Sequence, residues 1–193
     1  MCGRYFADTD EREMSILYSA FAGQPEVKAG EIFPTNLAPV ITKHGELQAM
    51  RWGFPRFDGK GAIINARSET AAEKAMFRYP MQYGRCLIPA SWYFEWEPAV
   101  PKKIKHAIRA DGPITYLAGL SRVEKDGETT FVILTRQACS QIRYIHDRMP
   151  VILQPQFHDE WLHGKSFAGL FEYANTDVVE NYRSRSQTSF PQH

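Results

Sequence analysis

The side chains best suited to chemistry lie in four short segments of the chain. These segments read CGR at residues 2–4, INARSET at 64–70, WYFEW at 92–96 and IHDRMPVIL at 145–153. They hold a thiol, carboxylates, an imidazole and an amide, accompanied by arginines. A nucleophile, groups that move protons and groups that bind an oxyanion or a phosphate make up the inventory of an active site. The sequence predicts such a site on the condition that the fold brings the four segments together.

Cys2 follows the initiator methionine directly, at a chain end that is usually frayed and chemically idle. Its thiol is either a nucleophile or a buried apolar side chain, and this residue alone leaves both open. Cys86 and Cys139 are interpreted as core residues, because free cysteine behaves as a small hydrophobe. The three cysteines lack the spacing of a metal site, and a reducing cytosol keeps them as free thiols. No metal and no organic cofactor is expected.

Glu95 lies in an aromatic strand-like segment. Alternation places Tyr93 and Glu95 on one face, and Trp92, Phe94 and Trp96 on the other. A carboxylate between aromatic side chains loses hydration, which raises its pKa toward the range that suits general acid–base catalysis. The alternative is a Glu95 that points to water from a half-buried strand, and this segment alone leaves that alternative open.

Asn65, Arg67 and Glu69 face the same way if INARSET is extended. An amide, a guanidinium and a carboxylate in a row are unusual for a strand that faces the core. The alternative is a solvated strand face with an arginine–glutamate surface pair, which contributes little to stability.

His146 and Arg148 alternate onto one face of the fourth segment. Histidine can move protons near neutral pH, and Pro150 favours an extended conformation at Met149. The alternative is a loop histidine that is bonded to Asp147.

Size and composition predict one globular domain over residues 1–193. The chain is 44% hydrophobic, which is enough for a packed core. No stretch approaches the ~18 apolar residues of a membrane span, and the N-terminus lacks an apolar signal core. We therefore expect a cytoplasmic protein. Because 23 basic residues nearly balance 22 acidic ones, any nucleic-acid site must be a local basic patch.

Turn residues and hydrophobic periodicity predict the elements that must position these side chains. Seven or more strands with a few short helices indicate an α+β fold with a curled, largely antiparallel sheet or barrel-like core. The tail from about residue 172 is left unassigned. In the first half of the chain we expect a strand at 2–6, a helix capped by Asp8 or Thr9, a hairpin at 44–45, a strand at 62–68 and a helix over 71–78 with Thr70 and Glu73 as a capping box. Further on we expect strands within 85–97, a meander over 103–135 with turns at 111–112 and 126–127, a strand at 148–153 and a short helix ended by Gly164.

The four segments, taken together, resemble the signature blocks of the SOS-response-associated peptidase (SRAP) family, also called abasic-site processing proteins. MCGRY, INARSET, FEW and IHDRMPVIL occur in the family's order, and the resemblance runs from residue 2 to about 162. Further positions that look like those of the family are NLAP at 36–39, WG at 52–53, RCLIPA at 85–90 and LAGL at 117–120.

The resemblance implies a definite chemistry. Family members act after Met1 is removed, bind single-stranded DNA and attack the ring-opened aldehyde of an abasic site, which gives a thiazolidine crosslink. Carried onto this chain, Cys2 supplies the α-amine and the thiol, and Asn65 orients the sugar. Glu95 and His146 move protons.

The resemblance also implies a partner, single-stranded DNA with abasic sites. Arg4, Arg67 and Arg148 resemble the family's phosphate contacts, and Trp52 and Met149 are added to the expected DNA-binding set. We expect a monomer without metal or membrane, associated with the nucleoid when bound to DNA.

Elementary chemistry favours Cys2 for this role independently. An α-amine has a pKa of about 7.7–8, so much of it is neutral and nucleophilic at about pH 7, unlike a lysine near about 10.4. The thiol is one side chain away and closes a small ring at little entropic cost. Only an N-terminal cysteine offers this 1,2-aminothiol.

Two other functions stay open from the sequence. One is a cysteine peptidase with Cys2 as nucleophile, His146 as base and Glu95 or Asn65 as the orienting group, whose substrate is as little as its own Met1. The other is a non-catalytic single-strand DNA binder. One departure bears on the site: family members commonly have glycine where this chain has Trp92, and a bulky side chain there is expected to reshape the floor under Glu95.

Overall fold

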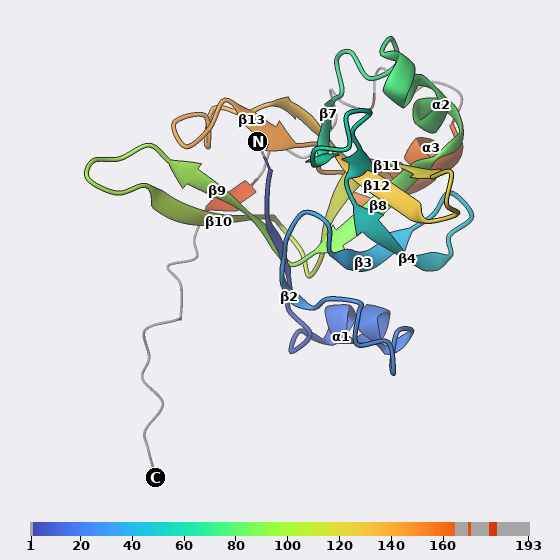
Figure 1. Cartoon of the computed structure of the whole chain (residues 1–193). Helices are drawn as coiled ribbons and strands as arrows, with labels where there is room; N and C mark the ends of the chain where they lie inside the picture. Colours follow the sequence, from blue (N-terminus) through green and yellow to red (C-terminus); the bar gives the residue numbers. More distant parts are fainter. Residues whose placement is uncertain (1, 165–169, 171–177, 181–193) are drawn as a thin grey trace.

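Five strands close into a small barrel in the computed structural model, which describes residues 2–164, 170 and 178–180. The ring closes because β11 pairs with both β8 and β12, while β3 links β8 to β4 and β4 links back to β12 (Figure 1). The β4–β12 pair is parallel and the other pairs of the ring are antiparallel. The barrel strands are β3 (Leu37–Ile41), β4 (Leu47–Trp52), β8 (Arg85–Ala90), β11 (Thr115–Val123) and β12 (Thr129–Gln137).

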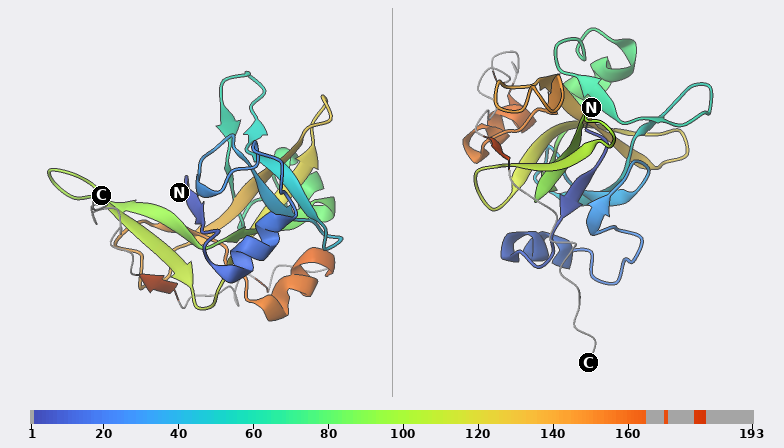
Figure 2. Two further views of the ribbon diagram at one scale, coloured as in Figure 1. Left: turned by 90° about the horizontal axis from the view of Figure 1, so that it is seen from below. Right: turned by 90° about the vertical axis from the view of Figure 1, so that its left-hand side faces the viewer.

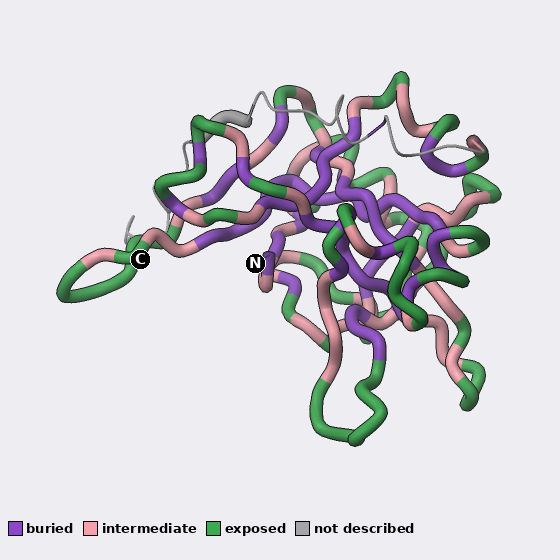
Figure 3. The backbone as a smooth tube through the Cα atoms, turned by 90° about the horizontal axis from the view of Figure 1, so that it is seen from above, coloured by how far each residue is buried: buried purple, intermediate pink, exposed green. Residues whose placement is uncertain are grey.

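A second sheet packs beside the barrel, in the order β14-β10-β9-β1-β2. Its β9–β10 hairpin projects away from the barrel, as Figures 1 and 2 show, and the loop at its tip is exposed (Figure 3). The strands of this sheet are β1 (Tyr5–Ala7), β2 (Gly30–Ile32), β9 (Trp92–Glu97), β10 (Ile104–Ala110) and β14 (Val178–Glu180).

Ser91 is the residue at which the chain passes from the barrel into the second sheet, between β8 and β9. It is fully buried, its backbone N–H donates to the Phe6 carbonyl at 2.8 Å, and its hydroxyl accepts from the Asp8 N–H at 2.9 Å. These bonds fix β9 against β1. The chain segment that precedes β1 therefore lies next to β9.

Two further strands that matter for the site pair with the C-terminal half of β12. β7 (Asn65–Arg67) runs parallel to β12, and β13 (Arg148–Pro150) runs antiparallel to it. Thr135 on β12 is the register partner of both Arg67 and Pro150. The second and fourth chemistry-bearing segments are thus brought together although about eighty residues separate them in the chain.

Three short helices lie outside the barrel (Figure 1). The expected helix over 71–78 begins later, because the Thr70 carbonyl accepts the backbone N–H groups of Glu73 and Lys74 and forms a turn there. The helix at residue 12 has Glu11 as its N-cap, without the side-chain cap expected from Asp8 or Thr9. The helices are α1 (Arg12–Ser19), α2 (Ala75–Tyr83) and α3 (His158–His163), with a 3-10 turn η1 (Pro155–Phe157) before α3.

The strand pattern differs from the prediction in several places, and β13 covers only the first half of the strand expected at 148–153. The expected meander breaks at residues 111–114, because β10 pairs with β9 in the second sheet while β11 pairs with β8 and β12 in the barrel. The strand expected at 62–68 is divided into β7 and a short β6 (Ala62–Ile63), which pairs with β5 (Phe54–Pro55). The predicted hairpin at Gly45 is confirmed by the antiparallel β3–β4 pair.

The core fills the barrel and the space between the two sheets, where the buried backbone gathers in Figure 3. Trp52 and Phe131 stack there with ring centroids 6.2 Å apart. Of the helices that the structure describes, none combines the length and the apolar character that a membrane crossing needs.

Candidate active site

Cys2 lies inside the protein, between the barrel and the second sheet. Its side chain is fully buried in the same hydrophobic cluster as Tyr5. The Asn65 side-chain amide donates a hydrogen bond to the Cys2 carbonyl at 2.8 Å, which ties the chain end to β7. The Cys2 thiol lies 3.8 Å from the Arg4 carbonyl. Cys2 is therefore anchored, unlike a residue of a frayed terminus.

A strand over residues 2–6 would place Cys2, Arg4 and Phe6 on one face, and this expectation is wrong at Cys2. β1 begins only at Tyr5, and Cys2 lies on the core side with Tyr5. Arg4 and Phe6 lie on the other side, where the Arg4 guanidinium is 5.0 Å from the Trp96 ring centre. Because the backbone before Tyr5 is not in the ladder, the period of two does not extend to Cys2.

Glu95 is buried beside Cys2, with only 3% of its surface exposed. Burial raises the pKa of its carboxyl to about 7, and the negative charge of Asp147 acts in the same direction. Burial also raises the pKa of the Cys2 thiol, and the charge of Glu95 adds to this effect. The alternative in which Glu95 points to water is wrong, because the face of β9 that carries Glu95 lies inside the protein.

Trp92 does not form the floor of the site. Its ring stacks on Phe6 at a centroid distance of 4.6 Å and an angle of 4°, in a cluster on the opposite face of the sheet from Tyr93. The large side chain at this position therefore lies on the other face of β9 from Glu95, and not under it as the sequence suggested.

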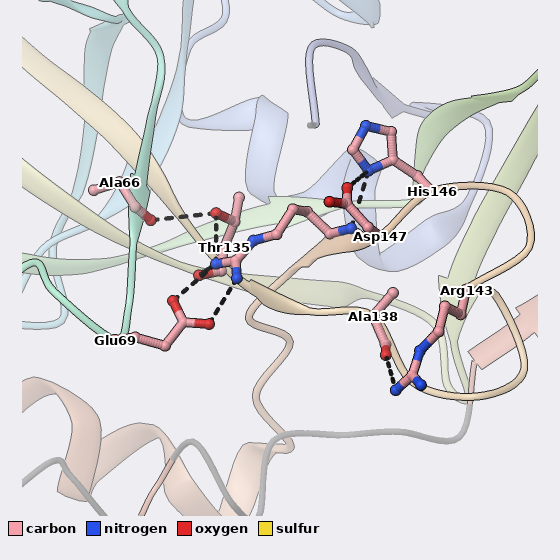
Figure 4. A network of polar contacts seen from close by, with 8 residues as sticks. Ala66, Glu69, Thr135, Ala138, Arg143, His146 and Asp147 are labelled. Carbon is pink, nitrogen blue, oxygen red and sulfur yellow. Dashed lines mark hydrogen bonds and ion pairs between the residues drawn. The ribbon is translucent and has the colours of Figure 1, made fainter.

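His146 and Asp147 lie directly before β13, and the negative charge of Asp147 acts on the Glu95 carboxyl. The His146 Nδ1 accepts the backbone N–H of Arg148 at 2.9 Å and lies 2.8 Å from Asp147 Oδ1 (Figure 4). Burial lowers the pKa of the His146 imidazole, which favours the neutral ring at about pH 7. Asp147 lies within ion-pair distance of the ring, as the sequence suggested, but Nδ1 of the neutral ring accepts from Arg148 and pairs with the carboxylate only once the ring is protonated. The neutral ring can still accept a proton, which the Asp147 carboxylate would stabilise.

The arrangement joins a buried cysteine near the chain end, an amide, a carboxyl and an imidazole, drawn from four separate segments. The family model described as SOS response associated peptidase (SRAP) matches residues 1–186. The chain belongs to the SRAP family.

Relatives of this SRAP chain include proteins from a bacterium and a yeast. Abasic site processing protein YoqW of Bacillus subtilis is 32% identical over 216 residues, which cover 99% of this chain and 95% of YoqW. Abasic site processing protein YMR114C of Saccharomyces cerevisiae is 36% identical over 143 residues, but the match covers only 39% of YMR114C and 68% of this chain. A crystal structure of a protein from Bacteroides thetaiotaomicron has a TM-score of 0.78 at 26% identity, covering 93% of this chain and 90% of that one.

The three arginines expected to bind phosphate have different surroundings in this SRAP structure. Arg4 donates to Glu31 at 3.3 Å, and Arg148 forms a two-pronged ion pair with Glu69 at 2.7 and 2.8 Å. Arg67 is exposed on β7. Two of the three guanidinium groups are thus already paired with carboxylates.

Trp52 and Met149 do not fit the predicted contact with DNA. Both are fully buried: the Trp52 indole donates to the Ile64 carbonyl at 3.0 Å, and the Met149 sulfur lies 3.4 Å from the Cys139 backbone nitrogen. A base cannot stack on a side chain that is closed off by the core, so we omit both from the contact set.

Several partners of the site were missed in the sequence. Glu31 lies in a segment without any chemical pattern, yet hydrogen bonds from Lys105 and Arg4 lower the pKa of its carboxyl although burial opposes them. The sequence offered, as one alternative, a surface pair between Glu69 and an arginine of its own segment, but Glu69 pairs with Arg148 of β13. The spacing of these partners in the chain, 27 and 79 positions, gives no local signal.

Within the described part of the chain, no group of three or more His, Cys, Asp or Glu side chains is arranged to hold a metal ion.

Proposed function

We propose that this SRAP protein processes abasic sites in single-stranded DNA by forming a covalent thiazolidine with its N-terminal cysteine. Relatives that span nearly all or about two thirds of the chain are named abasic site processing proteins, which supports the substrate. Removal of Met1 turns the backbone nitrogen of Cys2 into a free α-amine, and this amine is the first nucleophile.

The reaction balances without any co-reactant. The amine adds to the aldehyde of the ring-opened sugar, and the resulting carbinolamine loses one water to give an imine. The Cys2 sulfur then bonds to the imine carbon, and the thiol proton passes to the imine nitrogen. The thiazolidine closes through a thiol that is already attached to the reacting residue, so ring closure loses little entropy.

One observation carries this proposal: the Asn65 amide holds the Cys2 carbonyl at 2.8 Å, in the position where the buried carboxyl of Glu95 acts electrostatically on the Cys2 thiol. A cysteine that only filled the core would not need a tethered backbone and an adjacent buried acid. The tether keeps the aminothiol within reach of the groups that transfer protons.

Glu95 and His146 divide the proton transfers. With a pKa raised to about 7 by burial, Glu95 is partly protonated at neutral pH and can protonate the departing hydroxyl of the carbinolamine. His146, held neutral, can take a proton when the sugar ring opens. Because burial keeps the Cys2 thiol protonated, the amine attacks first and the thiol second.

The same high thiol pKa argues against the cysteine peptidase alternative. A peptidase needs the thiolate as nucleophile, and thiolates form where positive charge lowers the pKa. Cys2 has the opposite environment, with burial and Glu95 raising its pKa.

Arginine contacts to phosphate position the strand in this proposal. Arg67 is exposed two residues after Asn65, and Arg4 and Arg148 flank Cys2 and His146. Contacts to the DNA backbone carry no sequence information, so we expect recognition of the lesion and of a single strand without preference for base order.

Mass spectrometry of the N-terminal peptide tests the proposal directly. The purified protein is incubated with an oligonucleotide from which uracil has been excised, digested, and compared with a sample incubated with the intact oligonucleotide. We expect a peptide that begins at Cys2 and carries the sugar remnant less one water, only with the abasic strand. An adduct on any other peptide, with the Cys2 peptide unmodified, would refute the proposal.

The Asn65→Ala variant should form the adduct about five to ten times more slowly, since one hydrogen bond is worth about 1 kcal/mol and this one holds the Cys2 backbone. Single-turnover gel assays give the rate. Ser121→Ala is the matched control, because the Ser121 hydroxyl likewise donates to a backbone carbonyl, that of Gly84, at 3.0 Å. A wild-type rate in Asn65→Ala would contradict the role of the tether.

A further inference from the structure

The Arg148 guanidinium is held from two directions, by Glu69 and by Thr135, and Figure 4 labels these two partners. Its Nη1 and Nη2 donate to the two carboxylate oxygens of Glu69 at 2.7 and 2.8 Å. Its Nη2 also donates to the Thr135 carbonyl at 2.6 Å, with the Thr135 hydroxyl at 3.3 Å. Thr135 belongs to β12 and is buried, so this side of the guanidinium is fixed by the barrel. Glu69 closes the other side.

Burial differs sharply between the two charged partners. Only 11% of the Arg148 side chain is exposed, compared with 46% of the Glu69 side chain. The Arg148 Nε is buried and has no hydrogen-bond partner among the described residues. The arginine is thus part of the framework, whereas the glutamate sits at the surface and can rotate into water.

A carboxylate and a phosphate compete for the same geometry. Both accept two parallel N–H bonds from a guanidinium, and both must be charged to do so well. Arg148 lowers the pKa of the Glu69 carboxyl, so Glu69 is ionised at neutral pH and occupies the fork. The pair lies beside the site, because Arg148 is two residues from His146 and Glu69 is two residues from Arg67.

We propose that Glu69 is a built-in competitor for the DNA phosphate that Arg148 binds. In the DNA-free protein its carboxylate fills the guanidinium fork, and a phosphate of the bound strand displaces it. Glu69 thereby lowers the affinity for any single strand and makes stable binding depend on further contacts, such as those at the lesion. This inference rests on the proposed function, because it needs a DNA strand at Arg148.

The Glu69→Gln variant should bind single-stranded DNA more tightly. Glutamine keeps the size of the side chain but loses the charge-assisted pair, so the phosphate no longer has to displace an anion. We expect a dissociation constant about 3 to 10 times lower at moderate salt, in line with the modest strength of exposed ion pairs. The affinity should also fall more steeply with salt, because Arg148 then enters the complex as a free cation.

Fluorescence anisotropy with an undamaged labelled oligonucleotide, over a series of salt concentrations, measures both quantities. Glu128→Gln is the matched control, since Glu128 pairs with Arg51 at 2.6 Å and is partly exposed to a comparable degree. The Glu69→Gln change is also made in an Arg148→Gln background. General charge repulsion would act with or without Arg148, whereas competition requires it, so the gain should vanish in the double variant.

Weaker or unchanged binding by Glu69→Gln, or a gain that persists without Arg148, would overturn the inference. Thermal unfolding confirms that each variant is folded, and Glu69→Asp provides a second test, because its shorter carboxylate keeps the charge and should give a smaller gain. If the gain is missing while the Cys2 peptide still acquires the sugar remnant, only this inference fails. If the wild-type chain neither binds the strand nor forms the adduct, the proposed function fails with it.

Discussion

The Cys2→Ala variant should lose every adduct with abasic single-stranded DNA that survives denaturation, yet keep an adduct that borohydride traps. Alanine at position 2 still offers an α-amine once Met1 is removed, so the imine forms and can be reduced. Without the sulfur the imine cannot close to a thiazolidine, and it hydrolyses on denaturation. Denaturing gels with and without borohydride give the two yields, and intact mass confirms the loss of Met1.

Cys139→Ala is the matched control, because Cys139 is another free thiol of the described chain and is less buried than Cys2. It should form the resistant adduct at the wild-type level. A resistant adduct in Cys2→Ala at undiminished yield would exclude the thiazolidine. DNA affinity without any adduct in the wild-type protein would favour the non-catalytic binder.

The division of the aromatic segment into two faces could be predicted because it depends on local geometry, whereas the sequence left open whether Glu95 points inward. Residues 92–97 form one strand, and the period of two held from Trp92 to Glu95. The same rule was wrong for Cys2, which lies outside the ladder, and a sequence pattern does not show where a ladder ends. The Asn65–Cys2 bond, which joins positions 63 apart, was also beyond local reasoning.

The closure of the barrel could not be predicted from the sequence, because it also depends on contacts between distant segments. Short strands and turns predicted an antiparallel, barrel-like sheet, and the hairpins at Gly45 and Gly127 are present. The parallel pairings of β12 with β4 and β7 join strands that are far apart in the chain. Such pairings are selected by packing of the whole core, so no turn signal announces them.

The carboxylates that pair with the arginines could not be predicted from the sequence either. The sequence placed Arg4 and Arg148 near the reactive groups, but it did not indicate that Glu31 and Glu69 pair with them. An arginine in a motif is therefore not equivalent to an available cation. Whether it is available depends on a carboxylate that the fold brings from another strand.

The Glu95→Gln variant should form the adduct about 100 times more slowly at neutral pH, because general acid catalysis of carbinolamine dehydration is lost. In the wild-type protein the rate rises as the amine loses its proton, with a pKa of about 7.7–8, and falls as Glu95 ionises. With burial raising the Glu95 pKa to about 7, the rate should be greatest between about pH 7 and 8. Glutamine does not titrate, so the variant's rate should rise to a plateau.

Single-turnover rates across this pH range make the measurement, and Glu97→Gln is the matched control. Glu97 lies two residues further along β9 and pairs with His106 at 2.9 Å, so its variant should keep the wild-type rate and profile. A Glu95→Gln rate equal to that of the wild type, or a wild-type rate that keeps rising above about pH 9, would remove Glu95 as the acid.

Stability gives a second, independent reading of the same carboxyl. Because its folded pKa is raised above the ordinary value, the folded state prefers the protonated form, and stability falls as pH rises from about 4.5 to about 7. The shift corresponds to about 3 kcal/mol in the free energy of unfolding. Urea unfolding of the wild type should show this loss, whereas Glu95→Gln should not. A buried acid kept at this expense, beside a tethered Cys2, is understandable if its proton takes part in the reaction and is hard to explain as packing alone.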